Sequence, residues 1–237
     1  MADRSDFLTF VKPVDDRSKE IYQKFYRLFL DGLTSQKKPC VIVFAGGPGS
    51  GKTTHRRSAQ LKLEKAHVHD MDEILIRLPE YQKDLQSEGP KVAFEKWWPL
   101  AREIADALVQ YAIRLNYFIL YDRTCGAEGS YFDLLKAKNS GYRVLMNGYS
   151  VDASVALERI AQREEGLGRT VTKEMVLEYR ARFSALWPHY LSFVDEAHLY
   201  DTSGSHPKEL FSLEKGVKDP FLYQAFLEEG KAYRPQL

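Results

Sequence analysis

The chain has 237 residues, of which 44% are apolar and 28% are charged, with a formal net charge of +1. This composition is ordinary for a globular protein, and no apolar run approaches the roughly 20 residues that span a bilayer, so we expect no membrane partner. The balanced charge gives no indication of nucleic-acid binding. Cys40 and Cys125 make neither a disulfide framework nor a zinc site. We expect a cytoplasmic protein with reduced thiols, although a protein translocated into a host would have the same composition.

Short apolar segments alternate with longer helical patterns, which predicts βα units around a parallel sheet. The first pattern, at residues 12–37, is that of a mostly polar amphipathic helix. Five strands are expected, at residues 40–45, 66–69, 117–121, 142–146 and 197–200. Helices are expected at residues 54–65, 91–115, 152–165 and 172–190. Several strands end at acidic residues, and ligands bind at that edge of an open α/β sheet.

We predict one domain in three parts. Residues 1–37 form an N-terminal helical extension, residues 38–204 form the core, and residues 205–237 form an irregular or helical cover that contains Pro207, Pro220 and Pro235. There is no internal repeat and no low-complexity tract that would mark a domain boundary.

A glycine-rich loop follows the first strand and fits the G-x4-G-K-[ST] pattern of a phosphate-binding loop. Its glycines allow close backbone approach, so that successive N–H groups surround phosphate oxygens at a helix N-terminus. Lys52 is expected on the β and γ phosphates, and the Thr53 hydroxyl on Mg²⁺. The predicted ATP-binding residues are Gly46, Gly47, Pro48, Gly49, Ser50, Gly51, Lys52, Thr53 and Thr54. The fold class is therefore α/β, a P-loop NTPase fold whose five-stranded, mostly parallel sheet has helices on both faces.

Acidic residues beyond the loop favour phosphoryl transfer over nucleotide binding alone, since transfer to a hydroxyl needs a group that deprotonates it. Asp72 and Asp70 both follow the second strand, and the pattern does not rank one above the other. Asp122 ends the third strand, as a magnesium-binding carboxylate would, or it forms a turn. Thr124 contacts substrate or caps a helix.

Three arginines in the segment after the fourth strand are candidates for stabilising the transferred phosphoryl group. Arg159 and Arg163 are four residues apart and share a helix face, whereas Arg169 belongs to a glycine-containing lid segment. Taken singly, each is also compatible with a solvated surface position.

These motifs together resemble the zeta toxin family of P-loop kinases over residues 41–203. The resemblance implies that Asp72 is the catalytic aspartate, and that Asp106 and Thr124 bind substrate. It also implies that Arg159 or Arg163, with Arg169, clamps phosphate. The chain departs from the family pattern with Asp in place of Glu at Asp106 and Asp122. Arg123 is a further departure that adds a cation near the substrate.

The expected function is an ATP- and Mg²⁺-dependent kinase that phosphorylates a hydroxyl of a nucleotide-sugar, as better-known members of the family do with a UDP-linked N-acetylamino sugar. Alternatives are a kinase of another nucleotide, an antibiotic or a polynucleotide end, and a non-catalytic regulatory protein. Basic residues form no stripe with interleaved aromatics, which weighs against nucleic acid. An antitoxin or host protein is implied as a partner by the resemblance only. Trp97 and Trp98 are expected in the core, in the substrate wall or at an interface.

Overall fold

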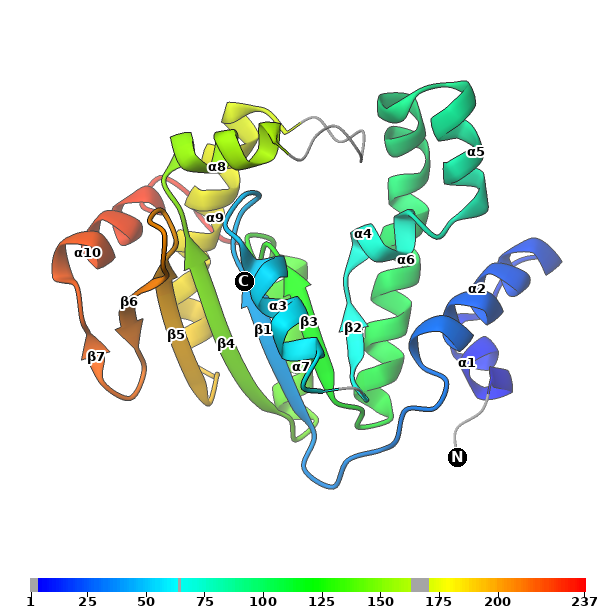
Figure 1. Cartoon of the computed structure of the whole chain (residues 1–237). Coiled ribbons are helices and arrows are strands. Elements are labelled where there is room, and N and C mark those ends of the chain that lie inside the picture. Colours follow the sequence, from blue (N-terminus) through cyan, green and yellow to red (C-terminus); the bar gives the residue numbers. More distant parts are fainter. Residues whose placement is uncertain (1–3, 64, 163–170) are drawn as a thin grey trace.

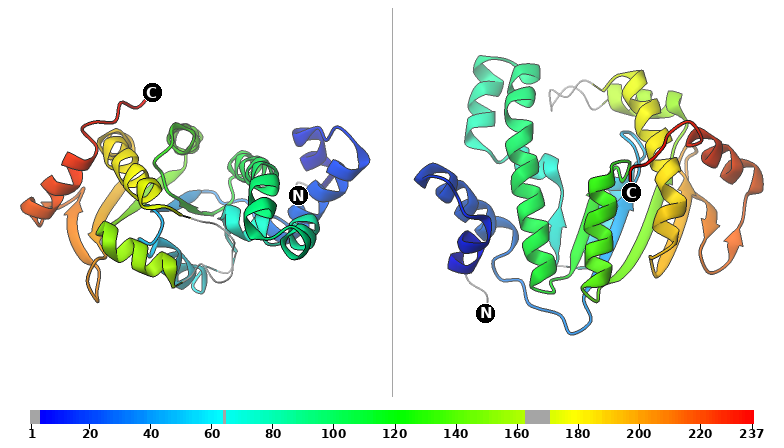
Figure 2. Two further views of the ribbon diagram at one scale, coloured as in Figure 1. Left: turned by 90° about the horizontal axis from the view of Figure 1, so that it is seen from above. Right: turned by 180° about the vertical axis from the view of Figure 1, so that it is seen from behind.

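The computed structural model describes residues 4–63, 65–162 and 171–237 (Figure 1). It confirms the α/β class: a mostly parallel sheet has α3 on one face and α6, α7 and α9 on the other (Figures 1 and 2). The strands are β1 (Cys40–Ala45), β2 (His67–His69), β3 (Ile119–Arg123), β4 (Arg143–Ser150), β5 (Glu196–Asp201), β6 (Lys208–Ser212) and β7 (Gly216–Val217). The helices are α1 (Arg4–Val11), α2 (Asp16–Phe29), α3 (Lys52–Gln60), α4 (Met71–Leu75), α5 (Pro79–Ser87), α6 (Pro90–Arg114), α7 (Glu128–Asn139), α8 (Ala153–Ala161), α9 (Lys173–Leu191) and α10 (Pro220–Glu229).

The strand order in the described part is β2-β3-β1-β4-β5-β6-β7, so the expected count of five is wrong by two. The five predicted strands are all present and pair in parallel. The additional strands β6 and β7 pair antiparallel beyond β5, in the segment expected to be an irregular or helical cover. They are short strands at the end of the sheet, beside Pro207 and Pro220. Their lengths of five and two residues carry too little alternation to be recognised in the sequence.

The N-terminal segment also differs from the expected single helix over residues 12–37. Helix α1 ends at Val11, Lys12 adopts a positive φ of 52°, and Pro13 follows. Helix α2 then begins with a capping box, in which the Asp15 side chain accepts a hydrogen bond from the Ser18 amide. Both helices pack on α6, where the rings of Phe7 and Tyr111 lie 5.0 Å apart, so their buried side chains join the main hydrophobic core.

Strand register brings the candidate site together. Phe44 aligns with Asp122 and Ala45 with Arg123, so the end of β1 and the end of β3 reach the same edge of the sheet. Helices α5 and α6 rise on one side of that edge, and α8 and α9 on the other (Figure 1). Within the described residues, none of the helices combines the length and the apolarity that a membrane span requires.

Candidate active site

The glycine loop connects β1 directly to α3 and has a P-loop backbone. Gly49 and Gly51 have φ angles of 77° and 80°, and Gly51 is the N-cap of α3. No described side chain caps this helix end, so its first-turn N–H groups have the arrangement that binds anions. A Cβ on Gly49 would lie 2.6 Å from the Ala156 carbonyl oxygen, because the backbone of α8 packs against the loop. The Lys52 Nζ donates to the Gly47 carbonyl at 3.4 Å, which holds the ammonium group over the loop.

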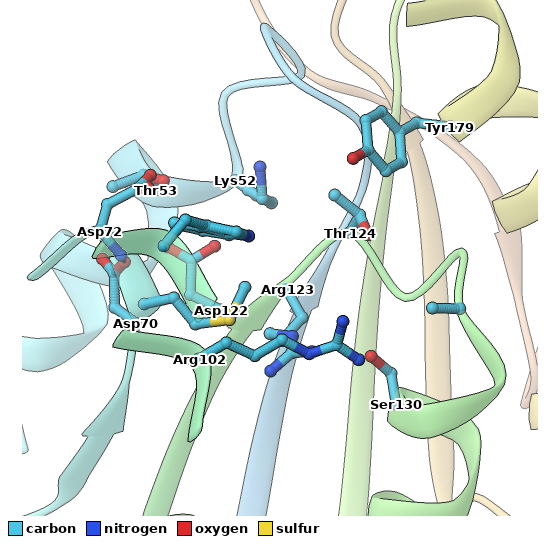
Figure 3. Close-up of a pocket in the computed structure, with 13 residues that line it drawn as sticks. Lys52, Thr53, Asp70, Asp72, Arg102, Asp122, Arg123, Thr124, Ser130 and Tyr179 are labelled. Atoms are coloured by element: carbon cyan, nitrogen blue, oxygen red, sulfur yellow. Dashed lines mark hydrogen bonds between the residues drawn. The ribbon is translucent and has the colours of Figure 1, made fainter. Parts of the chain in front are cut away.

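A pocket opens beside this loop at the carboxyl edge of the sheet (Figure 3). Lys52 and Thr53 line it from α3, and Asp70 and Asp72 line it from the end of β2 and the start of α4. The other lining residues are Met71, Trp98, Arg102, Asp122, Arg123, Thr124, Ala127, Ser130 and Tyr179. Six of the predicted site residues therefore meet in one cavity, namely Lys52, Thr53, Asp72, Asp122, Arg123 and Thr124.

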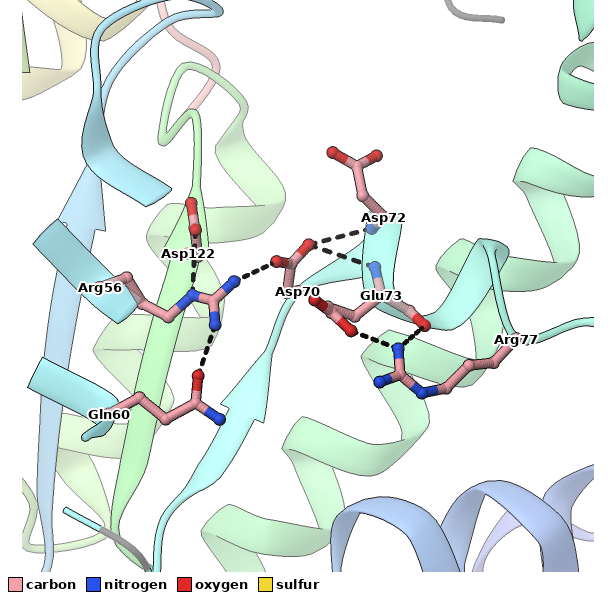
Figure 4. Close-up of polar contacts among 7 residues, drawn as sticks. All are labelled: Arg56, Gln60, Asp70, Asp72, Glu73, Arg77 and Asp122. Carbon is pink, nitrogen blue, oxygen red and sulfur yellow. Dashed lines mark hydrogen bonds and ion pairs between the residues drawn. The ribbon is translucent and has the colours of Figure 1, made fainter. Parts of the chain in front are cut away.

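Arg56 links two of the pocket carboxylates, those of Asp70 and Asp122 (Figure 4). Its Nη2 donates to Asp70 Oδ2 at 2.6 Å, and its Nε donates to Asp122 Oδ2 at 3.3 Å. The remaining Nη1 donates to Gln60 Oε1 at 2.7 Å. The side chain is only 2% exposed. Both carboxylates are therefore held by one buried cation on the helix that follows the phosphate loop.

Asp70 and Asp72 have different environments, which the sequence does not distinguish. Asp70 is buried and is the N-cap of α4, since its Oδ1 accepts from the amide of Asp72 at 3.0 Å and from that of Glu73 at 3.5 Å. Burial raises the pKa of Asp70 to about 6, and the nearby charges of Asp122 and Asp72 add to the increase. Asp72 instead extends from the first turn of α4, with its carboxylate pointing away from that of Asp70 (Figure 4). Both aspartates line the pocket, but Asp70 also caps α4 and pairs with Arg56, whereas Asp72 belongs to the first turn of that helix.

Arg123 and its partners form the end of the pocket opposite the loop. The Arg123 Nη1 donates to Asp106 Oδ1 at 3.0 Å and lies 3.0 Å from His69 Nε2. Because a guanidinium can only donate, His69 accepts through Nε2 and is neutral. Burial, together with the charge of Arg123, keeps the pKa of His69 well below its ordinary value. Arg102 also pairs with Asp106, with 3.7 Å between Nε and Oδ2. Asp106, predicted to bind substrate, thus holds two arginines in this structure.

Arg159 lies on the other side of the phosphate loop. Its Nη1 donates to the Gly49 carbonyl at 3.2 Å, and its Nη2 donates to the Thr202 carbonyl at 2.7 Å. It lines a second pocket together with Ser50, Gly51, Thr54, His55, Thr202, Gly204, Ser205 and Pro207. Arg159 therefore connects α8 to the loop and to the end of β5. The predicted residues Arg163 and Arg169 fall outside the described residues.

The residues present suit a magnesium ion that shares phosphate ligands. Thr53 supplies a hydroxyl and Asp122 a carboxylate to one pocket, beside the loop that would hold the phosphates. No group of three or more His, Cys, Asp or Glu side chains within the described ranges has the spacing of a metal cage. Mg²⁺ typically binds through one or two protein oxygens plus substrate phosphates and water, so this donor set fits the ion.

Several residues of the site were not predicted. Arg56 lies one helical turn after Lys52, and Arg102 one turn before Asp106, so the i, i+4 spacing was a usable signal for both. Ser130 and Tyr179 carried no local signal, because α7 and α9 bring them to the pocket only in the folded chain. Trp98 lines the pocket and stacks on Phe94 with ring centroids 4.9 Å apart. Its neighbour Trp97 instead donates to Asp84 Oδ2 of α5 at 2.7 Å.

Known structures share this fold at low sequence identity. A structure from the PezAT chromosomal toxin-antitoxin system of Streptococcus pneumoniae superposes with a TM-score of 0.69 and 18% identity, covering 94% of this chain and 96% of that chain. A structure of AvrRxo1-ORF1:-ORF2 with ATP also gives a TM-score of 0.69, with 15% identity over 100% of this chain and 81% of that chain. A search of the curated proteins returns no match.

A family model provides the sequence-level identification. The model described as Zeta toxin matches residues 28–201, which is well over half of the chain. The match contains the phosphate loop, the turn with Asp70 and Asp72, and the end of β3, and it confirms the resemblance drawn from those motifs. The chain therefore belongs to the zeta toxin family of P-loop phosphotransferases.

Proposed function

We propose that this protein is a kinase that transfers the γ-phosphate of ATP to a hydroxyl of a nucleotide-sugar. One observation carries the proposal. A single pocket joins Lys52 and Thr53 of the phosphate loop to a carboxylate, Asp72, and to the two arginines Arg102 and Arg123. A phosphoryl donor and an anionic acceptor thus have complementary groups on opposite sides of the same cavity.

The donor side would hold the ATP phosphates. Loop N–H groups and Lys52 would surround the phosphate oxygens, and Thr53 and Asp122 would hold Mg²⁺. When bound, the ion neutralises charge on the β and γ phosphates. The second pocket, with Arg159 and Thr202 beside the loop, is the proposed place of the nucleoside part of ATP. In this role Arg159 binds the donor rather than the transferred group, and the clamping role proposed from the family resemblance passes to Arg163 and Arg169.

Asp72 is the proposed base. The acceptor hydroxyl oxygen bonds to the γ-phosphorus as the bond to the β–γ bridging oxygen breaks, and the hydroxyl proton moves to the Asp72 carboxylate. ADP leaves with the bridging oxygen. Asp70 is a weaker candidate for this step, because both of its oxygens already accept hydrogen bonds from Arg56 or from the α4 backbone.

The acceptor end favours a molecule that carries phosphate. Figure 3 shows Arg102 and Arg123 adjacent near Ser130, across the pocket from Lys52 and Thr53. Guanidinium groups bind phosphate oxygens in a bidentate manner, and the ring of Trp98, which lines the same pocket, provides a flat apolar surface. A nucleotide-sugar combines phosphates, a flat base and several hydroxyls, which is why we choose it over a simple sugar.

A protein partner is part of the proposal. The similar structures come from a toxin-antitoxin system and from the AvrRxo1-ORF1:-ORF2 complex. By analogy, we propose that the chain acts as a toxin. Its partner would be either an antitoxin that controls the kinase site or a host protein.

The test is a screen of nucleotide-sugars and of the corresponding free sugars, with ATP and Mg²⁺, for acceptors that gain one phosphate by mass spectrometry. We expect phosphorylation of at least one nucleotide-sugar and none of the free sugars. Asp72→Asn should lower kcat by about 10²–10⁴-fold, the range typical of general-base removal, while ATP still binds. ATP binding without transfer to any acceptor would instead support the regulatory alternative.

A further inference from the structure

Arg56 connects the phosphate-loop helix to the turn that carries the proposed base. It lies on α3 three residues after Thr53 and is 2% exposed. Each of its three nitrogens donates a hydrogen bond, to Asp122, Asp70 and Gln60. Because the guanidinium is planar and all its nitrogens are engaged, its partners are held in fixed relative positions.

Asp70 continues this connection with its second oxygen. While Oδ2 accepts from Arg56, Oδ1 accepts from the backbone amides of Asp72 and Glu73. Helix α4 has only five residues, Met71–Leu75, and a helix this short has little stability of its own. The position of the Asp72 backbone therefore depends on Asp70, whose orientation depends on Arg56.

Stability alone is a poor explanation for this arrangement. Burying an arginine between carboxylates costs desolvation energy, and well-packed apolar side chains often stabilise a protein as much or more. The ion pairs do, however, determine geometry between α3, β3 and the start of α4. Proton transfer requires a heavy-atom distance of about 2.6–3.2 Å, and a misplacement of about 1 Å can lower the rate about 100-fold.

We propose that Arg56 is a positioning residue that acts through Asp70 to place Asp72 relative to the phosphate loop. The inference rests on the proposed function, because it takes Asp72 as the base. It gives Arg56 and Asp70 a role in catalysis without contact with the reacting atoms.

The kinetic test compares Asp70→Asn, Arg56→Gln and Arg56→Lys, using the acceptor found in the screen. Asparagine still caps α4 but loses the ion pair, so we expect kcat to fall about 10- to 100-fold, with KM for ATP within about threefold of wild type. Arg56→Gln should lose as much, and Arg56→Lys should recover part of the activity because it retains the charge. Arg57→Gln, at the exposed neighbouring position, is the matched control and should match wild type.

A double mutant separates positioning from a general structural effect. In the Asp72→Asn background, Asp70→Asn should cause no further loss of kcat, because the group that it positions is already removed. Equal losses in both backgrounds would overturn the proposal, as would a loss confined to KM for ATP. Thermal unfolding of each variant identifies any that fails to fold, and in that case Asp70→Asn, which keeps the cap, decides.

A second readout does not depend on any acceptor. Hydrogen exchange followed by NMR should show the amides of Asp72 and Glu73 exchanging at least about tenfold faster in Arg56→Gln, with amides of β4 unchanged. Unchanged exchange would overturn the proposed connection. If wild type phosphorylates no acceptor but this exchange effect is seen, the connection stands and the proposed function fails.

Discussion

The proposed donor and acceptor sides of the candidate active site are built in different ways. The phosphate-binding part of the donor side is one contiguous segment, residues 46–54, whose binding groups are mostly backbone amides set by glycine conformations. The acceptor side takes single side chains from different elements. Asp72 comes from α4, Arg102 from α6, Arg123 from β3, Ser130 from α7 and Tyr179 from α9.

Because of this difference, the two sides should tolerate amino-acid substitutions to different extents. A backbone site depends on φ angles and close packing, so few substitutions are tolerated there. A site made of side chains can be altered one residue at a time while the fold persists. We therefore expect the acceptor, rather than the phosphoryl donor, to depend on single side chains such as that of Arg123.

The largest effect is expected from a substitution that disrupts the backbone of the phosphate loop. Gly49→Ala adds a Cβ that would lie 2.6 Å from the Ala156 carbonyl oxygen, at a φ of 77°. Left-handed strain and overpacking together cost about 3 kcal/mol, so affinity for ATP should fall about 100-fold or more. Gly51→Ala is the matched control, since its φ is 80° but no described atom lies within 4 Å of the added Cβ. Its loss should be about tenfold, from strain alone. Titration with a fluorescent ATP analogue measures both, and equal losses would contradict the packing argument.

A smaller effect should be confined to the acceptor side. Arg123→Gln removes a cation that lines the pocket. Hydrogen bonds to charged groups contribute about 1.5–3 kcal/mol, so KM for the acceptor should rise about 10- to 100-fold. Steady-state kinetics should show KM for ATP within about threefold of wild type. Arg143→Gln, at the opposite end of the sheet, should change neither value. An equal rise in both KM values would mean that the two sides are not separable.

The smallest expected effect is a pH dependence of the free energy of unfolding that comes from β2, the strand that precedes Asp70 and Asp72. His67 of β2 is fully buried, and burial lowers its pKa to about 4 from an ordinary 6.5. Between these values the unfolded chain binds a proton that the folded chain does not, so stability is retained above pH 6.5 and falls as the pH decreases towards 4. At pH 5 this one group costs about 2 kcal/mol.

Urea unfolding of wild type and His67→Leu at pH 7.5 and pH 5 measures the difference. The variant should lose about 2 kcal/mol less than wild type on acidification. The pKa of Asp70 is raised to about 6, so its protonation stabilises the folded protein as the pH falls through 6. This contribution is the same in wild type and variant and cancels in the comparison. The same loss in both proteins would show that His67 does not titrate on unfolding.

Sequence patterns predicted the strands of the core better than the periphery. Strand β1 and the loop were recognisable because a buried apolar run meets a motif whose chemistry requires those residues at that spacing. The hairpin strands β6 and β7 were missed because strands of a few residues depend on their partners in the sheet, β5 for β6 and β6 for β7. Pro13, in the break between α1 and α2, was a local signal against a helix that begins at residue 12, and the separate helix α1 was not predicted.

The amino-acid sequence by itself determined the phosphate loop, because adjacent residues from Gly46 to Thr54 carry the geometry of that loop through the backbone. It also identified Asp70, Asp72, Asp122 and Arg123 as residues of interest. Only the tertiary structure distinguished Asp70 from Asp72, through the buried Arg56 that binds the former. It alone placed Arg159 beside the loop and Tyr179 in the pocket. The reason is physical: a phosphate loop is made by local φ angles, whereas an ion pair between residues far apart in the chain exists only once the sheet brings them together.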